Sequence, residues 1–251
     1  MYAGNIDGRA YEGSSGSLID VTNNGDVSSV MNMYGGSVFG GHTKASGTNR
    51  GGNIRVTGTG TLNILGGKIY NGNANSGGGN LYIESTGVVN MYGGLITDGM
   101  TNGVLLHESA NVLMHKTAKL NISGGEITGC ISGLDDTTAA TVAVSGSAKL
   151  TNPSSGSSNG YYRLIINNSG TAGKPRISLV IGQLNDDAIV RLTMKKTGDL
   201  PFVGQFATAA ENYTITQNDF KKVTFWWHGG PAISDKYTAV LKDNGLWVQE
   251  K

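Results

Sequence analysis

The sequence has little of what several common protein classes require. Among 251 residues it holds 4 prolines and 1 cysteine, and charged residues make up 15%, whereas globular chains average roughly 25% charged residues. So few charges disfavour coiled coils and helical bundles, which depend on Glu, Lys and Arg. The scarcity of proline excludes collagen. The single Cys130 excludes an internal disulfide and a cysteine zinc cage, and we interpret it as a small buried residue.

Strong charge and long apolar runs are missing as well. The formal net charge is +1, which provides no polybasic surface for nucleic acid or for an anionic membrane. No apolar stretch reaches the length of a transmembrane helix. We therefore expect no nucleic-acid partner and no membrane-spanning segment. Hydrophobic residues nevertheless make up 38% of the chain, which is too many for a disordered protein.

Glycine is abundant instead, at 40 residues, and much of it belongs to an internal repeat. One phrase, apolar-Asn-apolar-x-Gly-Gly-x-apolar, occurs four times, and its Asn positions are 31, 27 and 31 residues apart. Apolar residues alternate with Asn inside the phrase, as in a strand with one buried face. The four copies span residues 31–38, 62–69, 89–96 and 120–127.

A second element, Gly-Gly-Asn-apolar, lies between copies of the phrase at 51–54 and 78–81, with weaker copies expected at 103–106 and 141–144. Each unit of 27 to 31 residues then holds three short strands, such as 68–70, 80–83 and 88–91. A unit of this kind buries its apolar side only by stacking on its neighbours. The pattern predicts an all-β parallel solenoid, with Gly-Gly at the corners and the phrase Asn residues stacked as a hydrogen-bonded ladder.

The repeat decays after about residue 150. Residues 161–166, 176–181 and 188–193 are apolar strands that fit larger coils, and residues 237–242 and 246–249 flank an Asp-Asn-Gly turn typical of a hairpin. We predict a parallel β-helix over residues 1–200, regular to about 150. A β-rich C-terminal cap is predicted over residues 201–251.

The phrase and the Gly-Gly-Asn element resemble right-handed parallel β-helix repeats of large secreted surface proteins from Gram-positive gut bacteria, which are pectate-lyase-like in fold and adhesin-like in organisation. The resemblance implies an extracellular or cell-surface location. It also implies a non-catalytic segment that binds or displays a host glycoprotein, glycan or immunoglobulin. Open coil ends make self-association possible.

An enzyme is the main alternative, because polysaccharide lyases and glycoside hydrolases share this fold. Glycosidic hydrolysis needs paired carboxylates, and the candidates are Asp135 with Asp136, which we interpret as a solvated turn. Glu84 and Glu108 are expected on neighbouring coils, with His107 beside Glu108. The four histidines have no metal-ligand spacing among themselves; they are His42, His107, His115 and His228.

A purely structural stalk is a third reading. The sequence predicts no catalytic residue, metal or cofactor.

Aromatic residues supply the binding candidates. Trp226 and Trp227 are neighbours in a predicted strand, so their side chains point to opposite sides. Tyr161 and Tyr162 follow a Ser/Gly-rich loop. Exposed Trp and Tyr side chains stack on sugars or anchor protein interfaces, whereas the alternative is that all four fill the small core of the cap.

Overall fold

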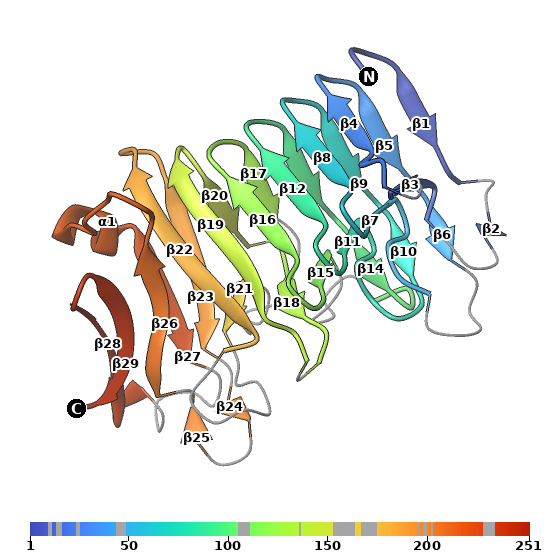
Figure 1. Cartoon of the computed structure of the whole chain (residues 1–251). Coiled ribbons are helices and arrows are strands. Elements are labelled where there is room, and N and C mark those ends of the chain that lie inside the picture. Colours follow the sequence, from blue (N-terminus) through green and yellow to red (C-terminus); the bar gives the residue numbers. More distant parts are fainter. Residues whose placement is uncertain are drawn as a thin grey trace.

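The protein is described by a computed structural model. It describes residues 1–9, 12–13, 17–23, 26–43, 49–104, 111–135, 137–152, 164–166, 175–194, 196–197, 200–201, 203–227 and 234–251. The fold is all-β, a parallel solenoid of about six turns, with the two chain ends at opposite ends of the stack (Figure 1). The predicted fold class is confirmed.

Each regular coil has three main strands, which stack into three faces. Face 1 begins with β4 (Val30–Met33), β8 (Thr61–Ile64), β12 (Val88–Met91), β16 (Lys119–Ile122), β19 (Ala140–Gly146) and β22 (Ile177–Leu184). Face 2 contains β1 (Asn5–Asp7), β5 (Ser37–Phe39), β9 (Lys68–Tyr70), β13 (Leu95–Thr97), β17 (Glu126–Thr128) and β20 (Lys149–Thr151). Face 3 contains β3 (Ile19–Val21), β7 (Ile54–Val56), β11 (Leu81–Ile83), β15 (Val112–Met114), β18 (Ile131–Gly133) and β21 (Leu164–Ile166).

A short-strand sheet, which the sequence did not predict, lies between faces 2 and 3 in the chain order of each early coil. Its members are β2 (Glu12–Gly13), β6 (His42–Thr43), β10 (Asn73–Ala74) and β14 (Met100–Thr101). Neighbouring strands are parallel and in register, so that Asn90 pairs with Asn63 and Asn121. Side chains of one type therefore form columns along the solenoid.

The core is built from the inward columns of all three faces. On face 1 the residues on either side of the phrase Asn point inward, as in Val89 and Met91, both with no exposed surface. Face 2 contributes one column, with Ile96 as a member, and face 3 contributes two, with Leu81 and Ile83 as members. Stacked apolar columns from successive coils thus supply the core that one coil alone lacks.

The glycine pairs form the corner between faces 1 and 2, as predicted, and a different constraint requires glycine at each of the two positions. The second glycine has a left-handed backbone, with φ between 78° and 91° in the four copies. A side chain on the first glycine would strike the backbone of the preceding coil, because a Cβ on Gly93 would lie 2.5 Å from the oxygen of Leu65.

Two sheets merge near the C-terminal end. The first residues of β23 (Ile189–Met194) pair with β20 of face 2, and its last three pair with β21 of face 3. β27 (Val223–Trp227) then pairs in parallel with β23 along its whole length. The later coils therefore have two walls where the earlier coils have three. A small antiparallel pair, β24 (Lys196–Thr197) with β25 (Leu200–Pro201), follows β23.

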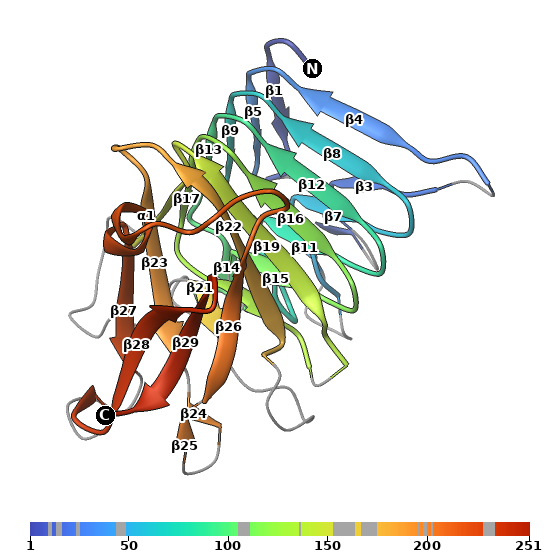
Figure 2. The ribbon, with the colours of Figure 1, turned by 60° about the vertical axis from the view of Figure 1, so that its left-hand side comes forward.

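The last coil ends in an antiparallel extension of face 1. β26 (Gly204–Ala209) is parallel to β22, β29 (Gly245–Glu250) is antiparallel to β26, and β28 (Tyr237–Lys242) is antiparallel to β29 (Figure 2). The predicted hairpin is confirmed, and its Asp243 and Asn244 have φ of 50° and 51°. Parallel pairing continues past residue 200, through β26 and β27, so the domain boundary at 200 stays a prediction.

One short helix, α1 (Gln217–Lys221), connects β26 to β27. Its Thr216 and Asp219 form a capping box, and the Asp219 carboxylate also accepts from the backbone N–H of Leu184 (3.0 Å) and the Tyr213 hydroxyl (2.6 Å). These bonds attach the helix to the end of β22. Within the described residues, no helix has the length and apolar composition needed to cross a bilayer.

Two predicted copies of the Gly-Gly-Asn element are wrong. The face-3 strand that follows β11 is β15, and it is preceded by Asn111, which lies 31 residues after Asn80. Gly103 instead belongs to a tight turn in which Thr101 and Val104 bridge. Residues 141–144 lie in β19 and pair with β16, so they continue face 1.

The Asn ladder is confirmed, and a second ladder lies inside. On the outside of face 1 the amides join Asn32, Asn63, Asn90 and Asn121 at 2.8 to 2.9 Å. Inside, the amide nitrogen of Asn53 donates to Asn80, and that of Asn80 to Asn111, both at 2.7 Å. Asn53 and Asn80 have no exposed surface.

Candidate functional site

The aromatic binding candidates lie at the C-terminal end or outside the described residues. Trp226 and Trp227 are the last two residues of β27, opposite Thr193 and Met194 of β23, and both are half-buried. Trp227 packs against the main hydrophobic cluster. Tyr161 and Tyr162 lie outside the residues that the structure describes. Their roles in binding stay predictions.

The acidic and histidine candidates are partly brought together. Asp136, His107, Glu108 and His228 lie outside the described residues. The coil position after Glu84 is occupied by His115, because the N–H of His115 bonds to Ile83 one coil before it. The expected stacking of Glu108 on Glu84 concerns a residue outside the described part of the chain and stays a prediction.

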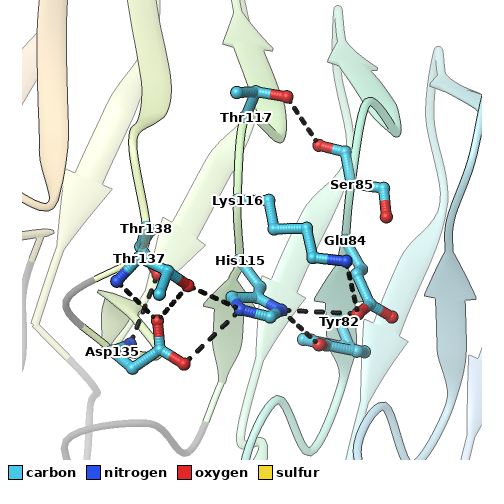
Figure 3. Close-up of polar contacts among 9 residues, drawn as sticks. All are labelled: Tyr82, Glu84, Ser85, His115, Lys116, Thr117, Asp135, Thr137 and Thr138. Carbon is cyan, nitrogen blue, oxygen red and sulfur yellow. Dashed lines mark hydrogen bonds and ion pairs between the residues drawn. The ribbon is translucent and has the colours of Figure 1, made fainter.

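His115 lies at the centre of a polar cluster that spans three coils (Figure 3). Its Nδ1 is 3.4 Å from Glu84 Oε1 and 3.3 Å from the Tyr82 hydroxyl. Its Nε2 is 3.4 Å from Asp135 Oδ2 and 3.2 Å from Thr137 Oγ1. Carboxylates from the coils before and after therefore face the two sides of one imidazole ring.

The repeat explains why these residues meet. Glu84 and His115 each follow a face-3 strand and begin a tight turn toward face 1, in which the second residue has positive φ: 60° at Ser85 and 54° at Lys116. Equivalent positions of successive coils stack at the parallel-strand spacing of about 4.8 Å. Asp135 lies at the start of the corresponding turn in the next coil, where its carbonyl accepts from the N–H of Thr138.

Hydrogen bonds and burial set the charge states in the cluster. The Thr137 hydroxyl and backbone N–H bond to Asp135, and His115 lies nearby, so the pKa of Asp135 is held below its ordinary value although partial burial opposes this. Burial, followed by the neighbouring charge of Glu84, raises the pKa of Tyr82 to about 12. Tyr82 therefore stays protonated and Asp135 stays ionised at neutral pH.

The cluster resembles a hydroxyl–imidazole–carboxylate relay, but its bonds oppose that chemistry. The Thr137 hydroxyl donates to Asp135 Oδ1 at 2.7 Å, so its proton is already committed away from His115. The His115 side chain is 14% exposed, which leaves little room for a substrate. These contacts link side chains of three successive coils.

A second feature is a group of exposed hydrophobic side chains on the surface of the solenoid. Eight large hydrophobic residues are exposed in the described part of the chain, and six lie on the first strands of face 1 or beside them. Four of these occupy one column at the face 1–face 2 corner; three of them directly precede the glycines of the phrase, and Tyr2 precedes Ala3-Gly4 at the equivalent position. We call this column the ridge: Tyr2 (79% exposed), Tyr34 (42%), Leu65 (43%) and Tyr92 (57%).

Backbone register fixes the ridge. The N–H of Tyr34 bonds to Met1, that of Leu65 to Met33, and that of Tyr92 to Ile64, so each ridge residue stacks on the one before. The Tyr2 and Tyr34 rings are parallel within 5°, with centroids 4.4 Å apart. At about 4.8 Å per coil the ridge is about 14 Å long. The ridge was not predicted because this position of the phrase accepts any residue, although a large apolar residue precedes Gly-Gly in three of the four copies.

Comparisons with known proteins add no family. No family model, no curated protein and no solved structure matches the chain. Among the described residues, no group of three or more His, Cys, Asp or Glu side chains is arranged to hold a metal ion.

Proposed function

We propose that the chain is a non-catalytic binding and display segment of an extracellular, adhesin-like surface protein, and that the ridge is its docking surface. The observation that carries this proposal is the concentration of exposed apolar residues at one corner of an ordered stack. Contiguous exposed apolar surface is uncommon on monomeric proteins and marks interaction sites. The adhesin-like setting follows the resemblance of the repeat to pectate-lyase-like surface proteins of gut bacteria.

The ring geometry favours a protein partner over a glycan at the ridge. A sugar stacks on the face of an aromatic ring, but the facing sides of Tyr2 and Tyr34 are covered by one another. Such stacking turns ring edges and hydroxyls outward. Tyr side chains presented this way are typical anchors of protein interfaces. The partner would be the polypeptide of a host glycoprotein or an immunoglobulin.

The outer surface of face 1 extends the docking surface. Val30 and Asn32 lie on the outer side of β4, and Tyr34 directly follows the last residue of that strand, so the Asn ladder runs beside the ridge. Three of the four ladder amides each donate one N–H to the preceding ladder residue, and an amide nitrogen has two N–H groups. Apolar anchors beside regularly spaced polar groups give the composition of a protein interface.

The proposal is tested by binding to immobilised secretory immunoglobulin, intact mucin and deglycosylated mucin. We expect saturable binding to a protein ligand that survives deglycosylation and weakens by about tenfold or more in the double variant Leu65→Ser, Tyr92→Ser. Val203→Ser is the matched control, because Val203 is 46% exposed and lies outside the ridge. Circular dichroism verifies the fold of each variant.

Other outcomes separate the remaining readings. Loss of binding in Trp226→Ala, with the ridge variant unaffected, would move the site to β27. Binding lost on deglycosylation would contradict a protein partner. Absence of binding to all three ligands would contradict the recognition proposal and favour a structural stalk, and hydrolysis or elimination of an acidic polysaccharide would contradict the non-catalytic part.

A further inference from the structure

A polar groove lies on the short-strand sheet, away from the ridge. It has a volume of about 300 Å³ and is lined by His42, Thr43, Asn73, Asn75, Asn102 and Gly103. This volume is at the lower end of the range for ligand sites. The lining side chains are amides, a hydroxyl and an imidazole. No carboxylate, ammonium or aliphatic side chain is among these six residues.

Hydrogen bonds hold the lining in place before any ligand arrives. Asn73 Oδ1 accepts from the N–H of Gly103 at 2.9 Å, and Asn73 Nδ2 lies 3.5 Å from His42 Nδ1. Thr43 Oγ1 accepts from the N–H of Asn75 at 2.9 Å. These contacts fix the orientation of the Asn73 amide, with its oxygen toward Gly103 and its nitrogen toward His42.

One wall of the groove is a turn that interrupts the repeat. After β14 the chain reverses between Thr101 and Val104, which exchange two backbone hydrogen bonds of 2.8 and 3.1 Å. The two central residues, Asn102 and Gly103, have φ of 49° and 74°, as in a type I′ turn. Asn102 is exposed, and its amide lines the groove.

We propose that this groove binds a single neutral sugar residue. The amide, hydroxyl and imidazole groups of the described lining match a ligand rich in hydroxyl groups, and none of these six residues carries a carboxylate, ammonium or guanidinium group that would pair with a charged ligand. The small volume accommodates one pyranose ring. The proposal is independent of the ridge, because the two surfaces share no residue.

The test is NMR titration of the ¹⁵N-labelled protein with galactose, mannose and N-acetylglucosamine, compared with glucuronic acid and glucosamine. We expect at least one neutral sugar to shift the side-chain amide signals of Asn73 and Asn102 saturably. Asn102→Gly removes the amide but keeps a residue that tolerates positive φ. This variant and His42→Ala should each weaken binding about three- to tenfold.

Asn212→Gly is the matched control, since Asn212 also has a positive φ of 58° and lies outside the groove. It should bind the sugar as the unmodified protein does. The proposal is overturned if no neutral sugar shifts the two amide signals, if only the charged sugars do so, or if neither groove variant weakens binding.

Discussion

At the scale of single residues, the two Asn ladders differ in whether water could replace the hydrogen bonds of each amide. Asn80 uses all four of its hydrogen-bonding positions: Oδ1 accepts from Gly72 and Asn53, and Nδ2 donates to Thr97 and Asn111. Water cannot reach this buried site. The outer Asn90 is half-buried, and water can replace its bonds. An Asn of the inner ladder should therefore contribute more to the free energy of unfolding than an Asn of the outer ladder.

This difference gives the first prediction. Asn80→Ala leaves several buried polar groups without partners and should lower the free energy of unfolding by about 3 kcal/mol or more. Asn90→Ala should cost about 0.5–1 kcal/mol. Urea denaturation followed by circular dichroism measures both. Equal losses in the two variants would contradict the distinction.

Asp219 gives a pH-dependent prediction. Burial raises the pKa of this carboxyl, but hydrogen bonds from Thr216, Tyr213 and the backbone of Leu184 outweigh burial, and the net pKa is below its ordinary value of 3.8. A depressed pKa contributes stability that is present above the ordinary value and is lost as the pH falls through the folded value. Asp219→Asn should therefore cost about 2 kcal/mol at neutral pH and progressively less below about pH 3.8.

Urea denaturation at several pH values tests this. The exposed Asp26 provides the control variant Asp26→Asn, for which the stability difference should stay small throughout. If the difference in the free energy of unfolding between the unmodified protein and Asp219→Asn does not decrease on acidification, the carboxylate charge is not the stabilising feature.

At the scale of elements, the corner glycines combine two constraints that substitution can separate. Gly94 has φ of 85°, and a Cβ there would lie 2.7 Å from the oxygen of Gly67, whereas Gly103 has φ of 74° with no atom within 4 Å of the added Cβ. Gly103→Ala should cost about 1 kcal/mol from backbone strain. Gly94→Ala should cost at least about 3 kcal/mol, because two coils must also move apart. Similar melting temperatures for the two variants would contradict the close approach of the coils.

The strands of the early coils were predictable because the phrase repeats the same alternation four times. Asn32, Asn63, Asn90 and Asn121 fixed both the register of face 1 and its ladder. Asn111 was missed because the spacing in the second element lengthens from 27 to 31 residues. The phrase lengthens in the same way, from 27 residues between Asn63 and Asn90 to 31 between Asn90 and Asn121, and that parallel was the available signal.

The His115 cluster and the groove depend on which turns lie side by side, and this is settled only when coils of unequal length are stacked. His115 and Glu84 are 31 residues apart, the same as Asn90 and Asn121, and that shared spacing was the one available signal. The ridge was closer to prediction, because its residues occupy one defined position of the phrase. The merging of faces 2 and 3 on β23 has no counterpart in the repeat and could not be predicted.

At the scale of the whole molecule, two equivalent positions of neighbouring coils lie 27 residues apart, so a deletion of 27 residues should remove one complete coil. Deleting residues 66–92 joins Leu65 to Gly93 and leaves Asn63 one coil from Asn121, with the register of every face intact. We expect a folded solenoid with a smaller free energy of unfolding, since stability is roughly additive over coils. Deleting residues 66–79 removes about half a coil and should prevent folding. Circular dichroism and calorimetry test both, and loss of structure in the first variant would contradict additivity.

The parallel, in-register pairing has a mechanical consequence. Hydrogen bonds between coils run along the solenoid axis, and the two chain ends lie at opposite ends of the stack. A force applied to the two chain ends therefore breaks the hydrogen bonds between one pair of neighbouring coils before it breaks those of the next pair. Each coil released would lengthen the chain by about 90–100 Å. In single-molecule stretching we expect a sawtooth of nearly equal steps, so the protein would yield gradually under tension and dissipate the load before any attachment at its surface is broken.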